Sequence, residues 1–398
     1  MLLALATILM VQAKKIEPPA AFAMAFSPNA ETRRQGFEAL SSIDWKPEFK
    51  KTAWDAYRKS AMHAALGKEF SERQIRTDDR TAPFKWRVVG TEVPGQPMPL
   101  VIALHGGGSG PKEMNDSQWE GMFSKYYNDA PARAPYVYCA LRAPNDEWNG
   151  FYDDSIAQVI ERLILAFELF GNVDASRVVV TGASHGGYGV FVIAPKIPHR
   201  FAAANASSGA PTDGETEGEN LRNLYFTTVN GALDTAYGRF DRMKAFSAKR
   251  KEWQAEDGGF PGGIAILEGV GHFVPDRDKP DELLQQKRAT APEKLFWTQT
   301  DDRVKTHYYL CDPSPKPGKK IRVERIGQSV AIVNRDGGTL ILYPPPGWVQ
   351  NEFVVIWGKS STAFHPQPSC AAYAESLALY GDPAFATPFK IKVENSGQ

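Results

Sequence analysis

The stretch Val178–Phe191, VVVTGASHGGYGVF, decides how the rest of the chain is interpreted. Its run of β-branched residues predicts a buried strand, and the residues after Ser184 predict a helix. Ser184 stands between Gly182 and Gly186, in the pattern G-x-S-x-G. Residues without side chains allow an abrupt strand-to-helix turn, on which a serine adopts strained backbone angles. The stretch therefore predicts either a reactive serine raised above a sheet or an ordinary serine in a glycine-rich loop.

The composition is that of a globular protein without a charge bias. The chain has 398 residues, 42% of them hydrophobic, which is enough for a large core and two or three domains. Its 46 basic and 46 acidic residues cancel. This balance argues against binding to nucleic acid or to an anionic membrane surface. The oligomeric state is left open by the sequence.

The first residues, MLLALATILMVQAKK, contain an apolar run from Leu2 to Val11. The run is too short to span a bilayer as a helix but suits the apolar segment of a secretory signal. Val11 and Ala13 give the small-residue pattern of a cleavage site, although no basic residue precedes the run. We therefore expect a signal peptide over residues 1–13, export to the periplasm or the exterior, and no stable membrane span. A buried N-terminal helix is the alternative.

Three further regions follow. Residues 14–83 are charged and helix-prone and predict a helical N-terminal region, with a packing stripe of Trp54, Tyr57, Met62 and Leu66. Residues 84–298 alternate short apolar strands with helical stretches, which predicts a mainly parallel α/β sheet with helices on both faces. Residues 299–398 hold short, closely spaced strands separated by turn residues, which predicts a small antiparallel β domain. We expect its strands to pack as a sandwich.

The three cysteines have no metal-ligand spacing. Cys139 lies in the strand-like PYVYCALRAP and is expected to be a small core residue. Cys311 and Cys370 are candidates for a disulfide in an exported protein, and the sequence does not decide whether they pair. We expect neither a metal ion nor a cofactor.

A serine nucleophile needs a base, and the base needs an acid that orients it. Among seven histidines, His272 alone lies in a loop just after a strong strand, in AILEGVGHF. Among the aspartates between Ser184 and His272, Asp234 alone directly follows a strand, in YFTTVNGALDTAY; the others are Asp213, Asp241 and Asp257. The order Ser184, Asp234, His272 is that of α/β-hydrolases rather than of other folds with a serine triad.

The predicted reaction also needs donors for an oxyanion. The sequence LHGGG, Leu104–Gly108, ends the predicted strand PLVIA with backbone amides that no side chain obstructs. We expect one donor to be the amide of His185, just after the serine, and the other to be an amide of Gly107 or Gly108. A phosphate-binding loop is excluded because no Lys-Ser/Thr pair follows the glycines.

Together, LHGGG, GASHGG, NGALD and GVGH resemble the corresponding motifs of α/β-hydrolase carboxylesterases. The resemblance is to secreted esterases of the polyhydroxybutyrate-depolymerase and feruloyl-esterase type, which are related to prolyl-oligopeptidase-type catalytic domains. It covers about residues 84–295 and implies an α/β-hydrolase sheet with covering helices. It also implies acyl transfer from a small-molecule or polymer-linked ester through a serine ester intermediate, with Ser184 as nucleophile, His272 as base and Asp234 as the orienting acid.

Two segments that follow predicted strands are expected to line the substrate, because ligands of open α/β sheets bind at the carboxyl ends of the strands. They are residues 115–119, NDSQW, and residues 146–154, DEWNGFYDD. The expected lining residues are Trp148, Asn149, Tyr152 and Trp119. For Trp119, core packing is the alternative.

Two other functions remain open at this level. A serine peptidase of the prolyl-oligopeptidase type is favoured by SHGGYG, but no repeats of a β-propeller precede Leu100. A non-catalytic protein on a hydrolase scaffold would use the β-rich region to bind carbohydrate or a surface. The complete Ser-Asp-His set argues against this second alternative.

Overall fold

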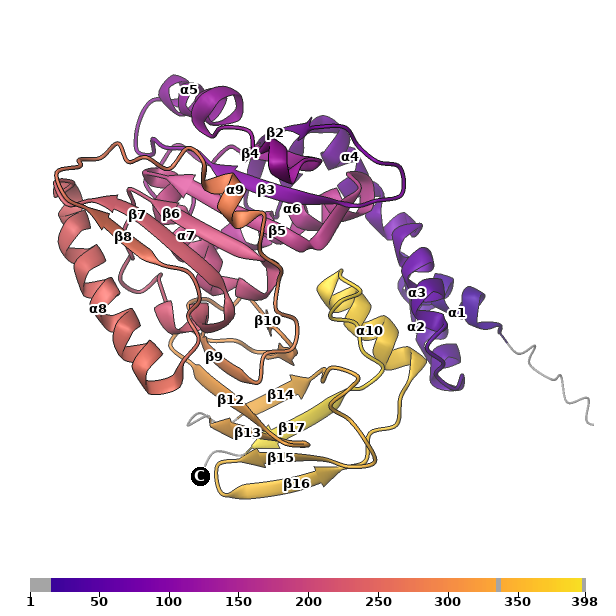
Figure 1. The fold of residues 1–398 in the computed structure, drawn as a ribbon. Coiled ribbons are helices and arrows are strands. Elements are labelled where there is room, and N and C mark those ends of the chain that lie inside the picture. Colours follow the sequence, from indigo (N-terminus) through magenta and orange to yellow (C-terminus); the bar gives the residue numbers. More distant parts are fainter. Residues whose placement is uncertain (1–15, 334–337, 396–398) are drawn as a thin grey trace, which may run out of the picture.

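A computed structural model describes residues 16–333 and 338–395 of the chain (Figure 1). The predicted signal peptide, residues 1–13, lies outside the described residues. No helix in the described ranges is long and apolar enough to cross a membrane. In the same ranges, no group of three or more His, Cys, Asp or Glu side chains is placed to hold a metal ion.

The centre of the molecule is an eight-stranded sheet with the strand order β1-β2-β4-β3-β5-β6-β7-β8. Strand β2 pairs antiparallel with β1 and β4, and every other pair in this sheet is parallel. The predicted α/β sheet is therefore confirmed. Its strands are β1 (Gln74–Arg76), β2 (Thr81–Val89), β3 (Met98–Leu104), β4 (Tyr136–Leu141), β5 (Val173–Ala183), β6 (Ala203–Ser207), β7 (Tyr225–Gly231) and β8 (Ile264–Leu267).

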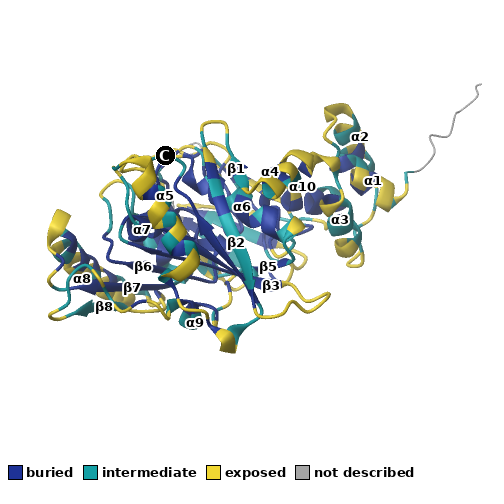
Figure 2. Cartoon of the chain, turned by 90° about the horizontal axis from the view of Figure 1, so that it is seen from above, coloured by how far each residue is buried: buried dark blue, intermediate teal, exposed yellow. Residues whose placement is uncertain are grey.

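Helices cover both faces of this sheet. Successive residues of a strand point to opposite faces, and the apolar side chains on each face pack against a separate set of helices. Leu100 and Ile102 of β3 belong to a core shared with α6, α7 and α8. Val101 and Ala103 belong to a second core shared with η2 and α9. The central strands are buried along their whole length (Figure 2). The flanking elements are α5 (Lys112–Gly121), the π-helical turn η2 (Met122–Tyr126), α6 (Ile156–Phe170), α7 (His185–Lys196), α8 (Arg239–Asp257) and α9 (Lys279–Leu283).

The N-terminal region is helical, but its last residues already belong to the sheet, since β1 and the start of β2 precede residue 84. Its apolar side chains pack against α10 (Cys370–Tyr380), near the other end of the chain. Tyr57 and Leu66 are buried, whereas Met62 is 39% exposed. The predicted stripe fails at Met62 because Ser60 caps a separate turn there and interrupts the helical spacing. The helices are α1 (Pro18–Ala25), α2 (Ala30–Ser41), α3 (Phe49–Arg58) and α4 (Ala64–Glu72).

The C-terminal region packs a five-stranded sheet, β16-β15-β13-β12-β9, and a four-stranded sheet, β10-β11-β14-β17, around one core. All pairs are antiparallel except β13 with β15, which is parallel. Strand β9 lies in the range predicted for the catalytic domain, so the β-rich unit begins at about residue 294. The strands are β9 (Lys294–Thr298), β10 (Thr306–His307), β11 (Leu310–Cys311), β12 (Lys320–Ile326), β13 (Ser329–Val333), β14 (Gly338–Leu342), β15 (Phe353–Trp357), β16 (Ser360–Phe364) and β17 (Ile391–Asn395).

All three cysteines are buried and free. Cys139 lies in β4, within the core of the main sheet. Cys311 and Cys370 belong to different cores, the first between the C-terminal sheets and the second between α10 and the N-terminal helices. The two cysteines therefore do not form the disulfide that the sequence left open.

A buried ion pair ties the C-terminal region to the main sheet. Arg288 Nη2 lies 2.7 Å from Asp382 Oδ2, and the two side chains are 1% and 2% exposed. The amide of Arg288 donates to the carbonyl of Ser176, near the amino end of β5 (3.1 Å). Burial raises the pKa of Asp382, but Arg288 and Arg200 outweigh this effect and hold the pKa below its usual 3.8. Asp382 therefore stays ionised and needs its cation.

We expect Asp382→Ala to lower the free energy of unfolding by about 3–5 kcal/mol, because it leaves the guanidinium of Arg288 buried without a partner. Urea denaturation followed by circular dichroism measures the change. Glu293→Gln is the matched control, since it removes an exposed pair with Arg325 and is expected to cost about 0–1 kcal/mol. Equal losses in the two variants would contradict the role given to the buried pair.

Candidate active site

Ser184 lies on the turn between β5 and α7 with φ 56° and ψ −117°. A side chain at Gly186 would place its Cβ 2.1 Å from the carbonyl oxygen of Leu104, and one at Gly182 would lie 2.4 Å from that of Gly186. The amide of Ser184 donates to the carbonyl of Ser207 at the end of β6 (2.9 Å). The turn therefore depends on the absence of side chains around the serine, as in the turns that present nucleophilic serines.

The structure brings Ser184, His272 and Asp234 together. His272 Nε2 lies 3.0 Å from Ser184 Oγ, and His272 Nδ1 lies 2.7 Å from Asp234 Oδ2. The three residues follow β5, β8 and β7, so they meet at the carboxyl edge of the sheet. Ser208 Oγ donates to the carbonyl oxygen of His272 (2.6 Å) and fixes the backbone of its loop. With this geometry, His272 can accept the hydroxyl proton while Asp234 holds the opposite side of the ring.

Asp234 is also held by Arg239, which the sequence did not predict. Arg239 Nε and Nη2 donate to the two carboxylate oxygens of Asp234, each at 2.7 Å, and both side chains are buried. Burial raises the pKa of Asp234, but the hydrogen bonds from Arg239 and His272 outweigh it and keep the pKa below 3.8. Arg239 is the first residue of the charged helix α8. Its neighbours in the sequence, RFDRMK, do not distinguish it from an arginine that faces solvent.

The expected oxyanion donors differ in availability. His185 is the first residue of α7, so its amide has no acceptor within the helix. Gly107 lines the cavity beside Ser184. The amide of Gly108, in contrast, donates to Asn115 Oδ1 (2.8 Å). The expectation that Gly108 serves as a donor is therefore wrong, because a side chain already occupies its amide.

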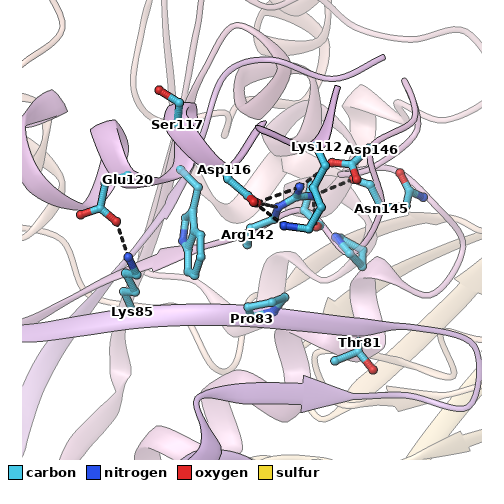
Figure 3. Close-up of a pocket in the computed structure, with 13 residues that line it drawn as sticks. Thr81, Pro83, Lys85, Lys112, Asp116, Ser117, Glu120, Arg142, Asn145 and Asp146 are labelled. Carbon is cyan, nitrogen blue, oxygen red and sulfur yellow. Dashed lines mark hydrogen bonds and ion pairs between the residues drawn. The ribbon is translucent and has the colours of Figure 1, made fainter. Parts of the chain in front are cut away.

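Asn115 connects the glycine loop to a charge network around the buried Arg142. Its Nδ2 donates to Asp146 Oδ1 (2.9 Å), and Asp146 in turn is paired with Arg142 at the end of β4. Arg142 also pairs with Asp116 of α5 (3.1 Å), as Figure 3 shows. Asn115 is 1% exposed and the Arg142 side chain 7%. The position of the loop therefore depends on residues that never face the serine.

Two histidines support the same region as neutral groups. His105 Nδ1 donates to the carbonyl of Gly106 (2.6 Å), and its Nε2 accepts from the amide of Ala143 (3.0 Å). Burial lowers the pKa of His105 to about 3. His185 Nε2 donates to the carbonyl of Trp148 (2.8 Å), and burial lowers its pKa to about 4. Both rings are neutral at ordinary pH, and neither serves as the base at Ser184.

A cavity of about 520 Å³ opens onto Ser184. This volume is in the range of pockets that hold small-molecule ligands. The wall comes from the glycine loop, α5, η2 and the loop after His272. Besides Ser184 and His272, its larger lining side chains are Gln118, Met122, Lys125, Tyr126, Phe273 and Arg277.

None of the four predicted substrate-lining residues lines this cavity. Trp119 lines the separate hollow of Figure 3, where its indole N–H donates to the carbonyl of Ala140 (2.9 Å), so it packs on the sheet. Asn149 and Tyr152 line another hollow. Trp148 is 37% exposed and lies beside the ring of His185 (5.6 Å between centroids). The reason is that the side chain of His185 fills the space between the serine turn and the 146–154 loop.

No protein-family model and no curated protein matches the sequence. Solved structures that are similar in part include a thermostable esterase, with 19% identity over 54% of this chain and 62% of that chain and a TM-score of 0.44. A putative dipeptidyl aminopeptidase IV from Bacteroides ovatus has 14% identity over 54% and 35% of the two chains (TM-score 0.40). A poly(3-hydroxybutyrate) depolymerase from Bordetella parapertussis has 17% identity over 53% and 83% (TM-score 0.36).

This chain spans less than two thirds of the first two of these structures. The fold is therefore assigned from the topology of this chain. The eight strands run in the order 1-2-4-3-5-6-7-8 with only β2 reversed against its neighbours β1 and β4. A serine with positive φ joins the fifth strand to the helix behind it. These features are those of the α/β-hydrolase fold.

Proposed function

We propose that the protein is a serine hydrolase that cleaves carboxylic esters through an acyl-enzyme intermediate. The observation that carries the proposal is the pair of contacts made by His272, which links Ser184 Oγ at 3.0 Å to Asp234 at 2.7 Å. A nucleophile and base within hydrogen-bond reach, with the base oriented by a third group, is the arrangement that activates a serine hydroxyl. The proposal therefore rests on geometry within this chain.

In the first half of the reaction, Ser184 Oγ attacks the ester carbonyl while its proton passes to His272 Nε2. The carbonyl oxygen becomes an oxyanion, and the amides of His185 and Gly107 are the donors that we assign to it. The His272 ring, now charged, is stabilised by the ionised Asp234. The carbon–oxygen bond to the alcohol then breaks, and His272 returns the proton to the leaving oxygen.

In the second half, water attacks the acyl group on Ser184. His272 Nε2 takes a proton from this water, the bond to Oγ breaks, and the proton returns to Ser184 Oγ as the free acid leaves. At ordinary pH the neutral rings of His105 and His185 do not compete for these protons, since their low pKa values make them weak bases. The reaction as written uses only side chains and backbone amides of this chain.

An ester is favoured over a peptide because the described residues ahead of the main sheet form the helices α1 to α4 rather than a β-propeller. Enzymes of the prolyl-oligopeptidase type gate the catalytic site with such a propeller. The two substrate classes are separated by the p-nitrophenyl ester and the p-nitroanilide of the same acyl group. A higher kcat/KM for the anilide would overturn the choice of ester.

We expect Ser184→Ala to reduce hydrolysis of p-nitrophenyl acetate by a factor on the order of 10⁶ in kcat, because no other group supplies the nucleophile. The release of p-nitrophenol measures the rate. Ser124→Ala, which changes an exposed serine of η2, is the control and is expected to keep its activity. Retention of more than a tenth of the activity in Ser184→Ala would refute the role of Ser184.

We expect Arg239→Gln to lower kcat by on the order of 10-fold or more, since a hydrogen bond to a charged group contributes about 1.5–3 kcal/mol. Arg239 lowers the pKa of Asp234, so its loss raises that pKa. The carboxylate is then protonated at a higher pH, so the loss of kcat/KM that protonation of Asp234 causes at the acid end of the profile begins at a higher pH.

The pH profile of kcat/KM measures this shift. Lys244→Gln removes an exposed positive charge from the same helix without touching Asp234 and is expected to leave the acid limb in place. If the acid limb of the profile moved equally in both variants, the net charge of the protein, and not the contact between Arg239 and Asp234, would determine its position.

We expect Asn115→Ala to lower kcat by about 10²-fold with a small change in KM, because a displaced glycine loop no longer presents its amide to the oxyanion. Steady-state kinetics with p-nitrophenyl acetate separates the two constants. Glu113→Gln, an exposed change in the first turn of α5, is the control. A rise in KM with unchanged kcat would place Asn115 in substrate binding and contradict a positioning role.

A further inference from the structure

The charged residues in the wall of the Ser184 cavity are all basic, the catalytic His272 aside. Lys125 on η2 and Arg277 in the loop after His272 both line it. No aspartate or glutamate is among its lining residues. The chain as a whole carries equal numbers of acidic and basic residues, so this local excess is not a reflection of composition.

Neither cation is neutralised by a carboxylate within the described part of the chain. Lys125 and Arg277 take part in none of the ion pairs found there. Arg277 Nη1 instead donates to the carbonyl oxygens of Lys125 (3.0 Å) and Tyr126 (3.1 Å). These bonds hold the guanidinium beside η2 and leave its other N–H groups for a ligand.

The nearest acidic side chains in the sequence are engaged elsewhere. Asp276 is buried and accepts from the hydroxyl of Tyr126 (3.2 Å). Asp278 Oδ1 accepts from Asn128 Nδ2 (2.8 Å). Neither carboxylate therefore forms an ion pair with Lys125 or Arg277, although burial raises the pKa of Asp276 and the charge of Arg277 acts to lower it.

We propose that Lys125 and Arg277 form a carboxylate-binding end of the catalytic cavity, so that the preferred esters carry a negative charge on the acyl or the alcohol side. This rests on the proposed function of Ser184. An arginine offers paired N–H donors that match a carboxylate, and a lysine adds a mobile point charge. Two unpaired cations at one cavity also raise the local concentration of an anionic substrate.

Two matched substrate pairs test the proposal with the full chain. On the acyl side, monomethyl adipate is compared with methyl hexanoate. On the alcohol side, γ-acetoxybutyrate is compared with butyl acetate. Hydrolysis is followed by proton release in a pH-stat, and the readout is the ratio of kcat/KM for the anionic ester to that for the neutral ester.

We expect this ratio to be about 10 or more in at least one pair, since a charge-assisted hydrogen bond contributes on that scale. Added salt is expected to lower the ratio, because it screens exposed charges. Lys125→Gln and Arg277→Gln are each expected to reduce it several-fold, and Lys125→Glu is expected to bring it below one. Arg277→Lys, which keeps the charge, is expected to retain part of the preference.

The control is the double variant Lys46→Gln/Lys244→Gln, which removes two exposed positive charges away from the cavity and is expected to keep the wild-type ratio. A wild-type ratio of one or less in both pairs, with the neutral esters hydrolysed, refutes this proposal alone. So does an unchanged ratio in the Lys125 and Arg277 variants. If the wild type cleaves none of the four esters, and p-nitrophenyl acetate as well is untouched, the proposed esterase function itself fails.

Discussion

Backbone atoms of β3, β5, β6 and α7 meet around Ser184 at distances that leave no room for side chains. A Cβ at Gly186 or Gly187 would lie 2.1 Å or 2.3 Å from a carbonyl oxygen of a neighbouring strand. This close approach brings the first turn of α7 to the carboxyl edge of the sheet, where the first amides of the helix have no acceptor within the helix itself. It also forces Ser184 to φ 56°, a conformation that costs of order 1–3 kcal/mol and persists only when the surrounding packing imposes it. The buried strands on either side supply that packing.

A second constraint acts at the acid. Asp234 is 5% exposed, and an isolated carboxylate at such a site would favour protonation. Arg239 offsets the loss of hydration by binding both oxygens, and it leaves Oδ2 shared with the ring of His272. One rigid pair therefore fixes the charge of the acid and the orientation of the base. The glycine loop is fixed in a similar way, since Asn115 links Gly108 to the ion pair of Asp146 with Arg142.

The sequence predicts the site residues that follow strands, but it misses those that lie on helices. Ser184, Asp234 and His272 each follow a strand, and glycines or small residues mark their turns, so their positions relative to the sheet were readable. Arg239 and Asn115 lie on helices, and there the sequence does not distinguish a side chain that turns inward from one that faces solvent. For the same reason the sequence leaves substrate lining and core packing open for Trp119, and the structure shows that it packs on β4. The sequence does not distinguish Gly107 from Gly108 as a candidate amide donor. The hydrogen bond from the Gly108 amide to Asn115 distinguishes them in the structure.

Two ion pairs attach the C-terminal region to the main sheet at ends away from the serine. Asp382 reaches Arg288 beside the amino end of β5, whereas Ser184 follows the carboxyl end of that strand. Asp301 pairs with Lys196 in the last turn of α7 (3.0 Å), about 17 Å along the helix from its start at the rise of 1.5 Å per residue. These contacts brace the scaffold without adding side chains to the cavity wall. Under the proposed function, substrate selection falls to the elements that do form the wall, namely the glycine loop, α5, η2 and the segment after His272.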